Sequence, residues 1–150
     1  MTTLRFLVTQ SDTAIALGSG DVPVLATPRL LAWMEAATVQ ATHQHLDPGQ
    51  TSVGTHVELR HRRATPVGRA VLVHVVSVQR SGAHLQFEVT AVESAERSRA
   101  TVDLTTPVGS AVPAADPPAA APDAGPPLAT ARVTRAVVDR GQFLAALESR

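Results

Sequence analysis

Hydrophobic residues change their spacing along the chain, and the change predicts a helix followed by several strands. From Thr27-Pro28 onward, apolar side chains recur around much of a helical circumference, which is typical of a largely buried helix. Threonine can accept a bond from a free helix N–H group, and proline at the first helical position loses none, so this pair suits a helix start. The helix should end near His43–His45, ahead of the turn signal Asp47-Pro48-Gly49. Its apolar positions are Leu30, Leu31, Trp33, Met34, Ala37 and Val39.

Three long strands are expected after this helix, at Ser52–Arg63, Arg69–Gln79 and Ala83–Glu93, with short turn signals between them. The middle run is apolar on both faces through Val71–Val76, which predicts a central place in a sheet. The third run alternates, with Leu85, Phe87, Val89 and Ala91 on one face and His84, Gln86, Glu88 and Thr90 on the other.

The ends of the chain carry weaker patterns. Thr130–Val138 predicts a further strand, Gln142–Leu147 a short terminal helix, and Leu4–Val8 with Thr13–Leu17 an N-terminal strand pair or edge. Seven of the 11 prolines lie between Pro107 and Pro127, so about residues 107–127 should form a mobile surface excursion rather than core. We therefore expect one domain over residues 1–150 of the α+β class, an antiparallel sheet wrapped around one central helix. The other face of the sheet needs cover, which a dimer would supply.

Composition narrows the possible functions. The 13 basic and 13 acidic residues cancel, which argues against binding nucleic acid through a basic surface. Cysteine is absent, so disulfides, iron–sulfur clusters, zinc ribbons and thiol nucleophiles are excluded. The most apolar run, Ala70–Val78, is short and interrupted by His74 and Ser77, so no membrane span is expected. The N-terminus lacks the features of a signal peptide, and we predict a cytoplasmic protein.

Few polar residues fall on the predicted apolar faces, and these are the candidates for chemistry. Glu35 is in the middle of the apolar helix, where a carboxylate is costly unless it is paired or hydrogen-bonded. A catalytic carboxylate and a glutamate that reaches the edge of the helix explain its position about equally well. His61 shares the apolar face of its strand with Thr55, Val57 and Leu59. A neutral imidazole there could act as base or donor, although by itself a satisfied core histidine is the simpler interpretation.

Thr27 is by position an ordinary N-cap, yet its hydroxyl lies at a helix N-terminus, where free N–H groups can hold a developing oxyanion. Thr27 and Glu35 are separated by roughly 12 Å along a helix, so they cannot touch on one straight helix. A joint site needs a group between them or contributions from two subunits. His43 and His45 lack the spacing to share a metal on a helix, and no metal site is predicted.

Two longer segments resemble a known family. The run VLATPRLLAWMEAATVQA, followed by LDPGQTSVGTHVELRHRRATPVG, is similar to the fluoroacetyl-CoA thioesterase branch of the hot-dog acyl-CoA thioesterases. The likeness covers most of residues 10–93 and resumes in ARVTRAVVDRGQFLAAL. It implies a dimeric hot-dog fold and a catalytic set of a threonine at the helix start, a glutamate eight residues later and a histidine 26 residues after the glutamate. Thr27, Glu35 and His61 stand at these spacings.

The resemblance implies hydrolysis of an acyl-CoA or a related acyl thioester, with CoA as part of the substrate and no cofactor. Glu35 would be the nucleophile or the base that activates water, His61 would exchange protons, and Thr27 would orient the pair or the substrate. Gly54-Thr55 matches a pair whose backbone is implicated in binding the thioester. Arg62 and Arg63 are candidates for the CoA phosphates, although a solvated strand end explains them more simply.

One departure from the family concerns the acyl group. Where the family's fluoroacetate-specific enzyme has aromatic lid residues, this chain has Gly18-Ser19-Gly20-Asp21-Val22-Pro23-Val24, so we expect a different acyl group. Two other functions stay open: a non-catalytic protein that binds an acyl thioester or small ligand, and a dehydratase or hydratase. The intact Thr27, Glu35 and His61 set argues against a pure binder, which has no need of a buried carboxylate. The sequence does not distinguish CoA from a carrier protein as the thiol.

Overall fold

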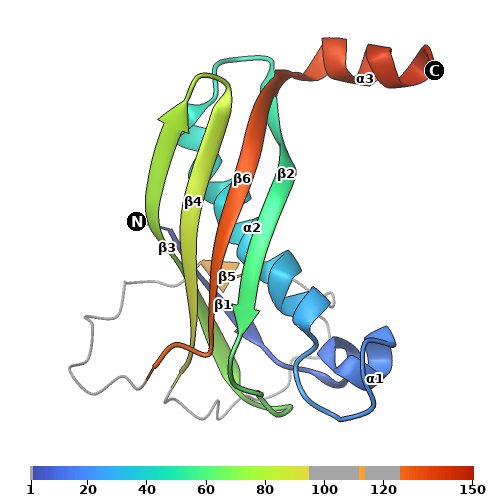
Figure 1. The fold of residues 1–150 in the computed structure, drawn as a ribbon, viewed down its shortest axis with the longest axis vertical. Coiled ribbons are helices and arrows are strands. Elements are labelled where there is room, and N and C mark those ends of the chain that lie inside the picture. The colour runs from blue at the N-terminus through green and yellow to red at the C-terminus, as the bar shows by residue number, and fades with distance from the viewer. Residues whose placement is uncertain (1, 95–111, 114–125) are drawn as a thin grey trace.

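The structure is a computed structural model that describes residues 2–94, 112–113 and 126–150. Five long or medium strands and one two-residue strand form a single sheet in the order β2-β6-β4-β3-β1-β5, and all paired neighbours run antiparallel. Helix α2 crosses one face of this sheet, and α3 leaves it at one end (Figure 1). The strands are β1 (Thr3–Leu7), β2 (Gln50–His61), β3 (Ala70–Ser81), β4 (His84–Glu93), β5 (Val112–Pro113) and β6 (Ala129–Asp139). The helices are α1 (Ala14–Leu17), α2 (Thr27–Thr42) and α3 (Arg140–Glu148), with short 3-10 turns at Gln10–Asp12 and His43–His45.

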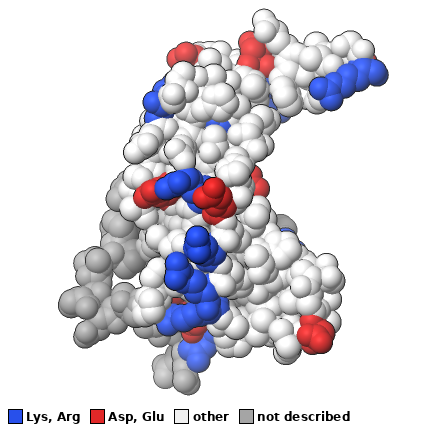
Figure 2. All heavy atoms as spheres, viewed as in Figure 1, with Lys and Arg blue, Asp and Glu red and all other residues white. Residues whose placement is uncertain are grey.

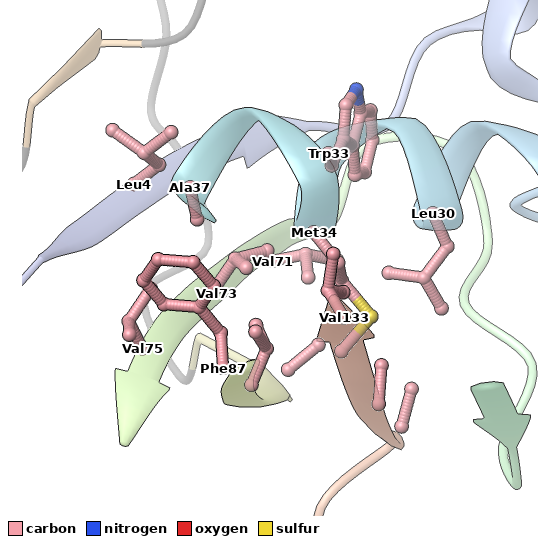
Figure 3. Packing of buried hydrophobic residues seen from close by; sticks show 14 of the residues in the cluster. Leu4, Leu30, Trp33, Met34, Ala37, Val71, Val73, Val75, Phe87 and Val133 are labelled. Atoms are coloured by element: carbon pink, nitrogen blue, oxygen red, sulfur yellow. The ribbon is translucent and has the colours of Figure 1, made fainter. Parts of the chain in front are cut away.

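The hydrophobic core lies between α2 and the sheet face that α2 covers (Figure 3). Alternation along β4 sends every second side chain into this layer, as predicted, because successive strand residues point to opposite faces. Helix α2 supplies the other side of the core, and its Trp33 ring stacks on Phe6 of β1 at 4.6 Å between ring centroids. The buried residues of β4 are Leu85, Phe87, Val89 and Ala91, and those of α2 are Leu30, Trp33, Met34, Ala37, Thr38, Ala41 and Thr42.

Two expectations about burial are only partly confirmed. Helix α2 is buried on one side, since Leu31 is half-buried and Val39 is 40% exposed. Strand β3 is interior only over its first half, because the short β1 pairs with it no further than His74. Beyond that point β4 is its one neighbour among the described strands, and Val76 is exposed. In the strand order β4 and β3 are the two middle strands, as predicted for β3, but β6 and β4 are the strands with neighbours on both sides along most of their length.

The predicted strand at Thr13–Leu17 is wrong. Residues Ala14–Leu17 form α1, because the Thr13 hydroxyl accepts a hydrogen bond from the N–H of Ala16 and Gly18 ends the turn with a φ of 72°. A positive φ costs glycine little, which is why a short apolar run can close as a helix here. Leu4–Val8, by contrast, is confirmed as a strand, paired with β3.

Most of the proline-rich excursion at about residues 107–127 lies outside the described residues. Val112–Pro113, inside it, forms β5 on the edge of β1. The other predicted elements are confirmed with boundaries shifted by one or two residues. The result is a sheet with a helix on one face and β2 along one edge.

Candidate active site

Thr27 is the first residue of α2, not its cap. Ala26 is the N-cap, and no side chain caps the helix, so the prediction of an ordinary N-cap threonine is wrong. The hydroxyl of Thr27 is therefore free for another partner, and its Oγ1 lies 2.8 Å from Nδ1 of His61. The backbone also joins these two regions, since the N–H of Leu25 donates to the carbonyl of Thr65 at 2.8 Å. The start of α2 and the end of β2 thus form one unit.

His61 is half-buried at the end of β2, on the face toward α2, as predicted. Burial lowers the pKa of His61, while the backbone of Arg63 acts in the opposite direction with less effect. The imidazole is therefore favoured in its neutral form. Within the described chain its Nε2 is buried and has no hydrogen-bond partner. A neutral ring held at Nδ1 and unbonded at Nε2 is able to accept or donate a proton at Nε2.

A pocket of about 310 Å³ opens beside this pair. Thr27 and His61 line it together with Arg62 and Arg63, which are both exposed, and with the loop that precedes α2. From that loop come Ser19, Gly20, Asp21, Val22, Val24 and Leu25. The two arginines predicted for substrate binding are thus at the rim of the pocket that holds Thr27 and His61.

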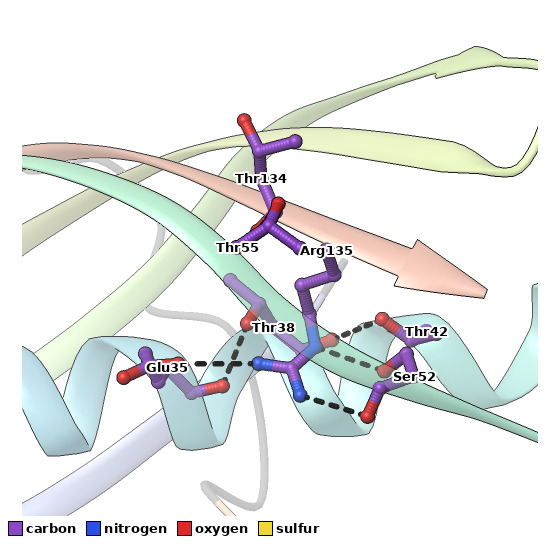
Figure 4. Close-up of polar contacts among 7 residues, drawn as sticks. All are labelled: Glu35, Thr38, Thr42, Ser52, Thr55, Thr134 and Arg135. Carbon is purple, nitrogen blue, oxygen red and sulfur yellow. Dashed lines mark hydrogen bonds and ion pairs between the residues drawn. The ribbon is translucent and has the colours of Figure 1, made fainter. Parts of the chain in front are cut away.

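Glu35 does not join this pocket. About two turns further along α2, its Oε2 lies 3.4 Å from Nη1 of Arg135 on β6 (Figure 4). The Arg135 side chain is only 7% exposed, and it also donates to Oγ and the carbonyl oxygen of Ser52, at 2.9 and 3.3 Å. Burial lowers the pKa of Arg135, and the Glu35 carboxylate opposes that shift. The Glu35 side chain is 33% exposed, so both Arg135 and water solvate the carboxylate in the middle of this helix.

Gly54 of β2 lies directly against Glu35. A Cβ added to Gly54 would stand 2.6 Å from Oε2 of Glu35, closer than two such atoms can approach. Glycine is therefore required here by the close approach of the carboxylate to the strand backbone.

A β-bulge determines which residues of β2 face α2. Gly54 pairs with Arg135 and His56 with Thr134, which leaves Thr55 as the extra residue of the bulge. Regular alternation would send Gly54 and His61 to opposite faces, because they are an odd number of residues apart. The bulge corrects this, and both residues contact α2. Thr55 itself is exposed, with its hydroxyl donating to the carbonyl of Thr134 at 3.3 Å, so the predicted place on the apolar face is wrong.

One chain therefore carries two half-sites: the Thr27–His61 pair and the Glu35–Arg135–Ser52 cluster. Thr27, Leu31 and Glu35 follow one another at a spacing of four residues, which places them along one side of α2. That side is exposed at Thr27 and half-buried at Leu31 and Glu35.

Arg135 was missed by the sequence interpretation although a signal was present. It stands between Val133 and Val137 on the core face of β6, where an unpaired charge would be costly. A basic residue at an apolar strand position predicts a buried acidic partner, and the buried-helix Glu35 was the one to match it with.

The opposite face of the sheet is charged (Figure 2). A hollow of about 460 Å³ lies there, with the ion pair between Arg132 and Glu88 in its lining. It is larger than the pocket at Thr27, and the cross-strand pair Thr90 and Thr130 lines it, but its lining contains no histidine and no helix terminus. We therefore place the candidate chemistry on the α2 face. Basic side chains gather on the charged face toward the end of the molecule where β2 ends (Figures 1 and 2).

Comparison with known proteins identifies the family. The family described as fluoroacetyl-CoA-specific thioesterase, FlK, matches residues 8–100, which is more than half of the chain. The chain belongs to this family. The matched residues include every member of the two half-sites except Arg135. Membership of the FlK family identifies the protein as a thioesterase. No protein with a curated description matches.

Solved structures similar to this FlK-family chain share its fold. A fluoroacetyl-CoA thioesterase FlK structure superimposes with a TM-score of 0.69 at 23% identity, covering 99% of this chain and 92% of that one. A thioesterase-superfamily protein from Thermus thermophilus gives 0.72 at 18% identity, covering 99% and 88%. A hot-dog-like protein from Thermanaerovibrio acidaminovorans gives 0.67 at 17% identity, covering 99% and 87%. The fold is the hot-dog fold, as predicted.

Residues 2–94, 112–113 and 126–150 contain no group of three or more histidine, aspartate or glutamate side chains placed to hold a metal ion. None of the helices described is long and apolar enough to cross a membrane.

Proposed function

We propose that this FlK-family protein hydrolyses an acyl-CoA to the free acid and CoA, at a site made of one subunit's Thr27 and His61 and the other subunit's Glu35. The observation that carries the proposal is the contact between Thr27 Oγ1 and His61 Nδ1, at a helix N-terminus and inside a pocket. A hydroxyl, a neutral imidazole and free helix N–H groups are the groups that thioester hydrolysis needs around its carbonyl.

A dimer through the free edge of β2 would complete the catalytic set. Among the described strands β2 pairs only with β6, so its other edge carries unpaired N–H and C=O groups over twelve residues. Two copies of β2 pairing antiparallel about Glu58 would set Val57 against the partner's Leu59. Because Thr55 is an extra residue in the strand, the register shifts by one beyond it, and Gly54 would face the partner's His61. Glu35, which lies against Gly54, would arrive beside the partner's Thr27–His61 pocket.

The reaction in this site requires one water per thioester. Either water that Glu35 deprotonates attacks the thioester carbonyl carbon and the C–S bond breaks, or Glu35 attacks that carbon directly and the mixed anhydride it forms is then hydrolysed by the water. In both routes the water supplies the oxygen of the new acid and one proton, and we propose that the Nε2 of His61 accepts this proton and passes it to the leaving thiolate. Thr27 holds the imidazole by its Nδ1, and the N–H groups at the start of α2 stabilise the negative charge on the carbonyl oxygen.

The pocket lining supports a proposal for the substrate. One of the similar FlK structures contains fluoroacetate and CoA, and another contains acetyl-CoA. We propose CoA as the thiol here, with Arg62 and Arg63 contacting its phosphates. The loop of residues 18–24 carries no aromatic side chain, so we propose an acyl group other than fluoroacetyl. Because hydrolysis needs no cofactor, none is proposed, and the cytoplasm stays the predicted compartment.

The test is release of free thiol from a panel of short, branched and aromatic acyl-CoAs by the parent and by Glu35→Gln. We expect turnover to fall by at least about 10³-fold in Glu35→Gln, because the amide can neither attack nor accept the proton. Affinity for CoA should be unchanged.

Glu88→Gln is the matched control, since Glu88 also pairs with an arginine of β6 but lies exposed on the other face. It should keep full turnover. A parent that binds acyl-CoAs without releasing thiol would overturn hydrolysis in favour of a binding protein, and a rearranged acyl chain without thiol would indicate a dehydratase or hydratase.

A further inference from the structure

Within the described part of the chain, helix α3 buries little of its surface, and only Phe143 is half-buried. None of its residues is buried, Leu144 is 48% exposed and Leu147 is 47% exposed. Leu147 lies about one helical turn after the adjacent pair Phe143 and Leu144, so the three form one apolar stripe. A nine-residue helix is marginal in water without tertiary packing, so this stripe is expected to meet another surface.

Helix α3 extends away from the hydrophobic core of its own chain. It begins directly after β6, where the N–H of Arg140 donates to the carbonyl of Gly49 and Asp139 pairs with Gln50. Figure 1 shows α3 leaving the sheet past β2, at the end of the molecule opposite α1. The edge it passes is the free edge of β2.

The arrangement of the β2-edge dimer determines which surface α3 would meet. This inference therefore rests on the proposed function. When Gly54 faces the partner's His61, the start of β2 at Gln50 lies beyond the end of the partner's strand. Helix α3 then emerges beside the partner's residues 62–65, next to the pocket that holds the partner's Thr27.

Among the described residues, that part of the surface carries exposed apolar side chains beside the charged Asp21, Arg62 and Arg63. Ile15 of α1 is 55% exposed, and Val22, which lines the pocket, is 50% exposed. Leu144, Leu147, Ile15 and Val22 are four of the eight large hydrophobic residues exposed in the described chain, and they lie at opposite ends of it. An antiparallel dimer brings these two ends together.

We propose that α3 of each subunit packs on α1 and the residue 19–22 loop of the other, and covers the partner's catalytic pocket. The residue 18–24 loop has no aromatic side chain with which to cover the pocket. The stripe of Phe143, Leu144 and Leu147 then supplies that apolar cover. Covering the pocket shields the acyl chain from bulk solvent and sets the length of acyl chain that fits.

The absence of cysteine allows a direct test by disulfide cross-linking of the full chain. Leu144→Cys and Leu147→Cys are each mixed with Ile15→Cys and with Val22→Cys under mild oxidation, and covalent dimers are identified by mass after digestion. A disulfide forms only where Cα atoms come within about 7 Å, so bonded pairs locate α3. At least one of the four pairs should form. Val76→Cys, which is exposed but on the other side of the sheet, is the control and should give none with α3.

The second measurement is turnover in the double variant Leu144→Ser with Leu147→Ser. It should fold with unchanged circular dichroism and remain a dimer by sedimentation, while kcat/KM falls by roughly tenfold, as expected when apolar cover of a substrate is lost. A dimeric, active parent with no cross-link in any pair would overturn the α3 proposal and leave the proposed function standing. A monomeric parent would overturn the shared site and α3 packing together.

Discussion

The ion pair between Glu35 and Arg135 is unequal, because the two side chains differ in exposure. Arg135 is 7% exposed, whereas Glu35 is 33% exposed. A charge that loses its partner is costly only if water cannot replace that partner. Removing Glu35 should therefore lower the stability of the protein more than removing Arg135.

We predict that Glu35→Leu lowers the free energy of unfolding by about 2 kcal/mol or more, because it leaves the Arg135 guanidinium buried beside apolar surface. Arg135→Met should cost only about 1 kcal/mol, since the exposed Glu35 can be hydrated. Urea unfolding of both variants and of the double variant measures this. Equal losses in the two single variants would contradict the asymmetry.

Thr27 shows how a residue's position and its role can differ. Its place before proline predicts an N-cap, but Ala26 takes that position and the Thr27 hydroxyl bonds His61. Sequence predicts that a hydroxyl lies at the helix start. It does not predict the partner, because that depends on where the end of a strand 34 residues later comes to lie.

At the scale of elements, β2 and α2 position the site together. The bulge at Thr55 turns Gly54 toward α2, and the backbone of Gly54 then leaves room for the Glu35 carboxylate. Any side chain at position 54 must displace that carboxylate.

Gly54→Ala tests this directly. The atom that the new methyl meets is the end of a flexible side chain, so the free energy of unfolding should change by less than about 1 kcal/mol. Turnover should fall by about 100-fold, because a displacement of about 1 Å at a reacting group has that effect. Gly141→Ala in α3 is the control, since its methyl would make only an ordinary contact with Asp139, and it should leave turnover unchanged. Normal turnover in Gly54→Ala would contradict the requirement for glycine.

The long elements could be predicted from the sequence, and the reason is visible in β4. Its alternation of Leu85, Phe87 and Val89 with polar residues matches a strand with one buried face, so pattern and burial agree. The stretch Thr13–Leu17 was predicted wrongly because four apolar residues fit a helical turn and a strand equally well. The bulge at Thr55 could not be predicted, since it is defined by pairing with β6, almost 80 residues away.

At the scale of the whole molecule, two half-buried histidines make folding depend on pH. Burial lowers the pKa of His61 and of His74, which also bonds Thr3 at 2.9 Å. In the unfolded chain both return to a pKa near 6.5, so below that pH the unfolded state binds more protons than the folded state. Their contribution to stability is therefore complete above about pH 6.5 and is lost as the pH falls toward their lowered pKa values.

We predict that the melting temperature of the parent falls from pH 7.5 to pH 5.5, and that it falls less in His74→Gln, because that variant has one fewer group to protonate. His74 lies outside the catalytic pocket, so turnover at pH 7.5 should be kept in the variant. Thermal scans at both pH values measure the difference. An equal fall in the two proteins would mean that His74 contributes nothing to the pH dependence.

In the proposed site, the catalytic set belongs to a dimer more than to the single chain. Sequence spacing relates Thr27, Glu35 and His61, but α2 holds the first two too far apart to act on one carbonyl. Only the geometry of β2, with its free edge and its bulge, indicates how a second copy could bring them together.

The stacking of Trp33 on Phe6 has a practical consequence. Trp33 is the single tryptophan of a chain without tyrosine, so the near-ultraviolet fluorescence of the protein arises almost entirely from one ring. That ring is 5% exposed and lies on α2 between Thr27 and Glu35. Its emission wavelength and lifetime therefore report on one helix turn between the two half-sites, and unfolding or movement of α2 can be followed optically without attaching a label.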